Sequence, residues 1–191
     1  MIRFEPVPQP NDFADKVEKT GAAWLADNPS AARPKDFWSP FKPALADGFR
    51  YLCAYLAMYE PVGTVDHFVS WNEDKAKAYE WANYRYCAAW INSSKQNLGT
   101  QEILDPFEVE DGWFKIILPS LQLVISHGVP GEHRKRAEFV LTRFHLRDDE
   151  RIIRQRREWY RMYQDGELNL YGLRKKAPLI ARAIEASEEE L

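Results

Sequence analysis

The feature that most constrains this chain is a set of polar residues at the ends of short β-prone runs in its middle third. Residues 62–66 (VGTVD) form a β-branched run after a proline, which predicts a strand entered from a turn. Asn83 opens a second short run, residues 84–86 (YRY), and Asn92 begins a polar stretch nine residues after Asn83. The pattern predicts a strand, a loop, a strand and a short helix, which together form a ββα unit.

Such a unit would bring the end of the first strand and one face of the helix to a common point. There Asp66 and Asn92 would supply oxygen ligands for a hard divalent cation, Mg²⁺ or Mn²⁺. His67 would act as the general base, because a histidine near its ordinary pKa can take a proton from water at neutral pH. Successive strand residues point to opposite faces, so Asp66 and His67 can serve one phosphate only from the frayed end of a strand. The predicted chemistry is hydrolysis of a phosphodiester bond.

These residues resemble the active-site motif of the HNH endonucleases, the ββα-metal family. The resemblance covers residues 49–97. It implies that Asp66 and Asn92 hold the metal and that His67 is the general base. It also implies that Asn83 braces the loop that carries this base.

Many HNH proteins flank the motif with two CxxC pairs that bind a structural zinc. This chain has only Cys53 and Cys87, and two cysteines cannot form a four-thiolate site, so no structural zinc is expected. An apolar cluster is predicted to clamp the module in place of the zinc: Leu52, Leu56, Trp90 and Ile91.

Basic residues near the motif and towards the C-terminus are candidates for phosphate contacts. Lys95, inside a stretch (NSSKQN) similar to the NxxKxN ending of many HNH proteins, would lie beside the phosphate path, and Arg85 would grip a flanking phosphate. The net charge of −3 argues against nucleic-acid binding, but residues 132–182 carry 14 Lys+Arg against 8 Asp+Glu. A solvated face paired with neighbouring acids is the open alternative to a phosphate contact there. A predicted helix in this stretch holds three spaced candidates for following a phosphate backbone: Arg154, Arg157 and Arg161.

The whole chain is predicted to have an α+β fold, with a ββα-metal nuclease module, a β-hairpin and a C-terminal helical bundle. Helical periodicity appears at residues 13–26, and WSPFKP at 38–43 predicts an extended aromatic strap. The predicted hairpin joins two β-prone runs, 113–118 and 121–126, and would cover the ββα unit. The predicted C-terminal helices span 132–145, 148–164 and 173–186. The predicted organisation is a proline-rich N-terminal strap (1–46), the nuclease module (47–100), the covering hairpin (101–130) and a basic helical region (131–191).

The cellular setting is predicted from what surrounds the motif. The N-terminus has no apolar signal region, and the longest uncharged run is too short and too polar to cross a bilayer. Two cysteines in this length favour a reducing cytoplasm, with no membrane partner. The layout also resembles small HNH proteins of bacterial retron-associated or Septu-type systems, which implies antiviral defence beside an ATPase partner.

The sequence therefore predicts a cytoplasmic, metal-dependent endonuclease that acts on DNA. One alternative is a non-catalytic subunit with an HNH-like fold that binds nucleic acid or protein. Another is a nuclease specific for RNA or for single strands, in which Trp71, Trp81 or Tyr84 stacks on unpaired bases.

Overall fold

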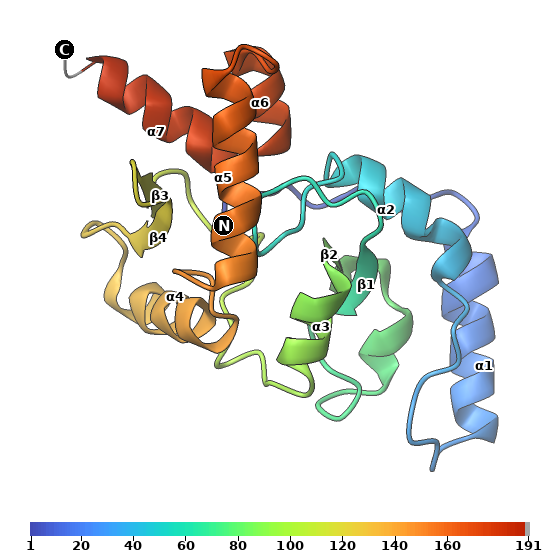
Figure 1. Ribbon diagram of the computed structural model, residues 1–191. Coiled ribbons are helices and arrows are strands. Elements are labelled where there is room, and N and C mark those ends of the chain that lie inside the picture. The colour runs from blue at the N-terminus through green and yellow to red at the C-terminus, as the bar shows by residue number, and fades with distance from the viewer. Residues whose placement is uncertain (190–191) are drawn as a thin grey trace.

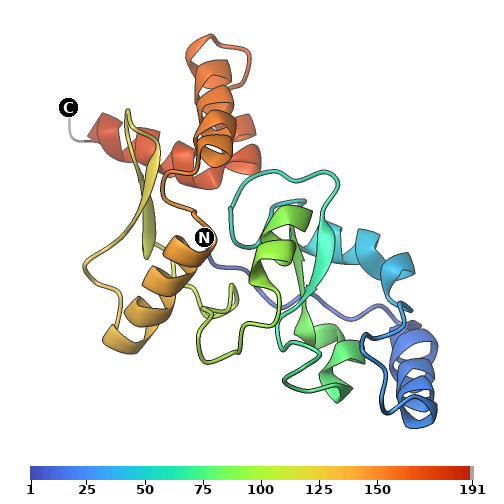
Figure 2. The same cartoon turned by 60° about the horizontal axis from the view of Figure 1, so that its bottom comes forward.

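The computed structural model describes residues 1–189 and shows an α+β fold (Figure 1). Helices and short strands divide into two halves, which lie side by side in Figure 2. One half holds the N-terminal helices and the predicted ββα unit. The other holds a hairpin and the C-terminal helices. Within the described residues no helix combines the length and the apolar character needed to cross a membrane.

The ββα unit has the predicted order of elements. Strand β1 (Thr64–His67) pairs antiparallel with β2 (Tyr84–Cys87), and helix α3 (Ala89–Lys95) follows and packs on β1. The register sets Thr64 opposite Cys87 and His67 opposite Tyr84. Because His67 still pairs with Tyr84, β1 is regular to its last residue. The prediction that Asp66 and His67 lie at a frayed strand end is therefore wrong.

The N-terminal segment confirms one prediction and corrects another. Helical periodicity at 13–26 corresponds to a π-helical stretch, Ala14–Lys19, that continues into α1 (Thr20–Asp27). The extended strap is wrong, because Ser39–Phe41 is a 3₁₀ turn that runs into α2 (Lys42–Gly48). Each of these helices carries a proline in its first positions, where the fixed φ of proline suits a helix start.

Residues 50–59 form an irregular buried knuckle between α2 and β1. Ala54 donates its amide to the carbonyl of Tyr86 at 2.8 Å, and the Cys53 sulfur accepts the amide of Ala88 at 3.3 Å. Cys53 and Cys87 are both buried free thiols. Around them the predicted clamp residues Leu52, Leu56 and Ile91 are buried, and Trp90 is half-buried beneath the guanidinium of Arg151.

The C-terminal half begins with the hairpin, which forms within the two residue ranges predicted for it. Strand β3 (Phe114–Ile117) pairs with β4 (Gln122–Ile125), and four helices follow where three are predicted. The predicted helix at 173–186 is divided because Pro178 has no amide hydrogen to continue the preceding helix. The four helices are α4 (Gly131–Arg143), α5 (Glu150–Gln164), α6 (Leu170–Lys176) and α7 (Pro178–Glu189).

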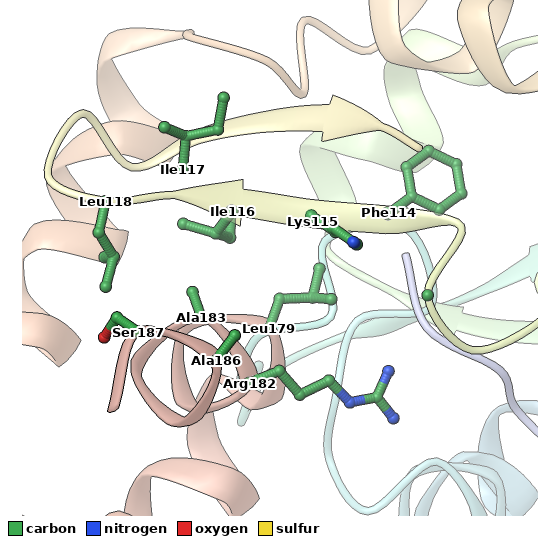
Figure 3. Close-up of a pocket in the computed structure, with 11 residues that line it drawn as sticks. Phe114, Lys115, Ile116, Ile117, Leu118, Leu179, Arg182, Ala183, Ala186 and Ser187 are labelled. Carbon is green, nitrogen blue, oxygen red and sulfur yellow. The ribbon is translucent and has the colours of Figure 1, made fainter. Parts of the chain in front are cut away.

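The hairpin packs on the C-terminal helices, so its predicted place over the ββα unit is wrong. Strand β3 lies against α7 and β4 against α4. Figure 3 shows the reason, since the aliphatic side chain of Ile116 points towards Leu179 and Ala183 of α7. The alternating face of β3 thus buries its apolar side against a helix of its own half.

Contacts between aromatic and backbone groups join the two halves. The rings of Tyr55 and Phe144 meet edge to face, with centroids 5.1 Å apart, and the amide of Tyr59 donates to the carbonyl of Lys176 at 2.8 Å. Arg156 of α5 does not cross between the halves; it is buried within the C-terminal half, where it donates to backbone carbonyls that include Leu121 and Leu146. One arginine of the predicted basic helix is therefore structural, and burial lowers its pKa to about 10.

Candidate active site

His67 and Asn92, two of the predicted site residues, line the same pocket. The pocket has a volume of about 370 Å³ and lies at the outer edge of β1. Two cations from the N-terminal segment, Arg33 and Lys42, also line it, together with the carboxylate residue Asp36. The fold therefore brings a candidate base, an amide and two positive charges to one hollow.

The hydrogen bond made by His67 fixes which ring nitrogen can act as a base. Its Nε2 lies 3.0 Å from the carbonyl oxygen of Ala78. A carbonyl oxygen can only accept, so Nε2 carries the hydrogen and the lone pair of the neutral ring is on Nδ1. The indole of Trp38 packs edge to face on the imidazole with centroids 4.5 Å apart, and Tyr84 does so at 5.1 Å. The ring is thus held in one orientation with a defined basic atom.

The protonation state of His67 also suits a base. Burial lowers the pKa of its imidazole below the ordinary value, and the neighbouring Asp66 carboxylate opposes this shift only in part. A histidine whose pKa is lowered is neutral at physiological pH, so Nδ1 is free to take a proton.

Asn83 holds the loop that positions the partner of His67. Its Oδ1 accepts the amide of Val69 at 2.7 Å, and its Nδ2 donates to the carbonyls of Val69 at 3.0 Å and Lys77 at 2.9 Å. Ala78, which accepts from His67, follows Lys77 directly. The side chain therefore ties the two ends of the loop together, in the position where the HNH resemblance sets a bracing asparagine.

Asp66 points away from the pocket into the core. Its Oδ2 accepts from the Tyr55 hydroxyl at 2.8 Å, and its Oδ1 accepts from Lys95 Nζ at 2.7 Å. Lys95 Nζ also donates to the backbone carbonyls of His67 at 2.5 Å and Phe68 at 3.0 Å. The cause is strand geometry, because neighbours on β1 face opposite sides and His67 takes the side that faces the pocket.

The predicted magnesium ligands do not fit a metal site as they lie. Both Asp66 oxygens have partners, and the side chain is buried. Asn92 donates its Nδ2 to the carbonyl of Val65 at 3.0 Å, which leaves Oδ1 as its only ligand atom. Mg²⁺ is usually held through one or two carboxylates, with water and substrate oxygens completing its shell, and here the only carboxylate of the predicted pair is already taken. Residues 1–189 also contain no group of three or more His, Cys, Asp or Glu side chains that could hold a metal ion.

The structure does not bring Lys95 and Arg85, two predicted phosphate contacts, to the pocket surface. Lys95 is 1% exposed and is paired with Asp66. Arg85 is 4% exposed and forms a two-point ion pair with Asp105, at 2.8 and 2.6 Å, with its guanidinium over the ring of Phe107. Both cations are held by buried carboxylates, so neither reaches a phosphate in this arrangement.

Arg33 and Lys42 are the basic residues of the pocket that sequence reasoning missed. In the described part of the chain neither is in a salt bridge. They flank Trp38, and the pattern around Trp38 predicts only packing. Only the contact between Trp38 and His67 identifies them as pocket residues. These two residues are far apart in sequence, so no local pattern indicates the contact.

The three α5 arginines predicted to contact phosphate are exposed. Arg154 pairs with Glu150 at 2.7 Å, and Arg161 pairs with several acids that include Asp165 at 2.7 Å. Arg157 is in no salt bridge within residues 1–189. Acidic neighbours thus compensate two of these charges, and a phosphate contact there stays a prediction.

The groove in Figure 3, between β3 and α7, is the contrasting case. Aliphatic side chains dominate it, and Arg182 at its edge pairs with Asp111 at 2.8 Å. No histidine or carboxylate is among the residues that line it. Acid–base chemistry is therefore better served at His67.

No family model matches the chain, and no curated protein or solved structure matches it either.

Proposed function

We propose that the protein is an HNH-like endonuclease that hydrolyses phosphodiester bonds in DNA with His67 as the general base. The observation that carries this proposal is the fixed, neutral His67 ring in a pocket with two cations. A nuclease needs both features, since a base must activate water and positive groups must hold the anionic diester.

The chemistry follows from the groups of the pocket. Nδ1 of His67 takes a proton from a water molecule, and the resulting hydroxide attacks phosphorus while Arg33 and Lys42 hold the phosphate oxygens. The bond to the departing ester oxygen breaks, and this oxygen takes a proton from solvent. The imidazolium keeps its Nε2 hydrogen bond to Ala78, which stabilises the positive charge until the ring returns its proton to water.

The proposed requirement for Mg²⁺ or Mn²⁺ stays a prediction from the HNH resemblance. Asp66 would have to leave Tyr55 and Lys95 before it could bind a cation. A place in antiphage defence in the cytoplasm, beside an ATPase partner, is likewise proposed from the resemblance alone.

A specific observation favours a second candidate, a non-catalytic binding subunit. The carboxylate expected to hold the metal is taken up by a lysine of the same motif. A scaffold that has lost its metal would keep such a pair for stability. This candidate predicts no cleavage by the purified protein and no effect of Asp66→Ala on metal binding in calorimetry.

Nicking of supercoiled plasmid tests the proposal. Wild type, His67→Ala and Asn92→Ala are compared in Mg²⁺, Mn²⁺ and EDTA, with Lys115→Gln, at an exposed position of β3, as the control variant. We expect His67→Ala to lose cleavage at least a hundredfold, as general bases contribute 10²–10⁴-fold, with an unchanged circular dichroism spectrum. Equal nicking by wild type and His67→Ala refutes the role of the base, and no nicking by wild type favours the binding subunit.

A further inference from the structure

A second pocket lies where the knuckle of residues 50–59 meets α6. Its volume is about 620 Å³, larger than the pocket at His67. Arg174 also lines it but is paired with Glu185 at 2.6 Å, and no acidic residue lines it. Tyrosines and cations supply most of its surface: Tyr51, Tyr59, Tyr171, Arg50, Lys175 and Lys176.

The knuckle side of this pocket has an unusual backbone. Arg50 and Tyr51 are consecutive non-glycine residues with φ of 56° and 55°. Such left-handed conformations are disfavoured for residues with a side chain, and here they form the turn that ends α2. Hydrogen bonds hold this turn, since the amide of Tyr51 donates to Ala46 and its carbonyl accepts from Glu60, both at 2.7 Å. The turn directs an arginine and a tyrosine into one hollow.

The α6 side supplies an exposed aromatic ring among lysines. Tyr171 is 63% exposed, and Lys175, one turn later, lies with its ammonium 4.3 Å from the ring centroid. Lys176 Nζ lies 3.1 Å from the ring centroid of Tyr59. The tyrosine rings and the ammonium groups therefore alternate across the junction between the two halves.

From this pocket we infer a binding site for single-stranded nucleic acid. Aromatic faces stack on bases, and cations follow phosphates, so this lining matches a chain that carries both groups. Unpaired strands fit better than a duplex, because the bases of a duplex already stack on one another. The residues predicted from the sequence to stack cannot all do so, since Trp81 and Tyr84 are 5% and 1% exposed. Tyr171 is the exposed aromatic ring of this pocket, with the Lys175 ammonium over one of its faces.

This site goes beyond the proposed cleavage at His67 and does not rest on it. Binding can be measured in EDTA with His67→Ala, where no cleavage is expected. If His67 is also catalytic, the site would select unpaired strands or frayed ends as substrate.

Fluorescence anisotropy tests the inference, with a labelled 12-nucleotide oligo-dT and a labelled duplex hairpin of equal length. We expect the single strand to bind more tightly, with affinity that falls as salt rises. Tyr171→Ala should weaken binding about 5- to 150-fold, the range of a lost stacking contact. Lys175→Gln should weaken it less and flatten the salt dependence, whereas the matched control Lys115→Gln on β3 should stay within twofold of wild type.

Three results would overturn the inference: no binding of the single strand by wild type, tighter binding of the duplex, or an unchanged affinity in Tyr171→Ala. Equal competition by thymidine monophosphate and by the oligomer, per molecule, would also overturn it, because the site would then take a nucleotide and not a strand. Tyr171 and Lys175 are exposed, so their variants should fold, and thermal melting confirms this. The weakening by Tyr171→Ala is measured in EDTA and relative to Lys115→Gln, so a failure here is distinguished from a failure of the nuclease proposal, which is read from nicking.

Discussion

Lys95→Met tests whether the lysine of the motif serves the fold or the substrate. In the structure its ammonium is fully enclosed by Asp66 and by the carbonyls of His67 and Phe68. Methionine keeps a similar length and apolar volume but leaves a buried carboxylate without its partner. Breaking a buried ion pair from one side costs about 3–5 kcal/mol. For a chain of this size that lowers the melting temperature by roughly 6–20 °C.

A double-mutant cycle in urea, followed by tryptophan fluorescence, measures the coupling. Asp66→Asn alone should also destabilise, because it leaves the ammonium of Lys95 buried and unpaired. The double variant should recover much of the loss, since a neutral amide can still accept from Tyr55 and no unpaired charge remains. The matched control is Lys77→Met, which breaks a half-exposed pair with Glu80 and should cost about 1 kcal/mol at most.

The opposite result would refute this reasoning. If Lys95 lies beside the phosphate path, as the HNH resemblance implies, Lys95→Met would leave stability near wild type and reduce only nicking. A loss of stability no larger than that of Lys77→Met would therefore show that the ammonium is not enclosed by Asp66.

The remaining predictions concern the pocket. Nicking should rise with pH as His67 loses its proton, with a midpoint below the ordinary histidine value of about 6.5, because burial lowers the pKa of this imidazole; a midpoint above that value in a pH–rate profile contradicts the assignment. Because the pKa of His67 is lower in the folded state than in the unfolded state, its contribution to stability is full above the unfolded-state pKa and is lost as pH falls through the folded-state pKa. His67→Gln should therefore reduce the change of the urea unfolding midpoint between pH 7 and pH 5. Arg33→Gln and Lys42→Gln should raise KM and reduce its salt dependence with unchanged melting, and an unchanged KM in both would remove them from the phosphate site. Asn83→Ala deletes three hydrogen bonds and should speed amide exchange in the loop after His67 as well as slow nicking. EDTA should leave the melting temperature within a few degrees, since a drop of tens of degrees would reveal a structural metal.

Local patterns predict much of this fold, because they depend on neighbours in sequence. The β-branched and aromatic runs become β1 and β2, and the hairpin falls where two β-prone runs surround a proline. Long-range contacts are where prediction fails. Nothing near residues 38–43 shows that Trp38 will pack on His67, or that Arg33 and Lys42 will share its pocket. Likewise the alternation in β3 predicts an apolar face without showing which helix covers it.

The placement of Asp66 shows how two lines of sequence reasoning compete. The HNH resemblance sets Asp66 and His67 at one phosphate, whereas the period of a strand sends them to opposite faces. The structure follows the strand, and Asp66 meets Lys95, 29 residues away, behind the sheet. There the ammonium binds the carboxylate and the His67 carbonyl together. The pair therefore acts on the candidate site through the backbone of β1, by fixing the residue whose ring faces the pocket.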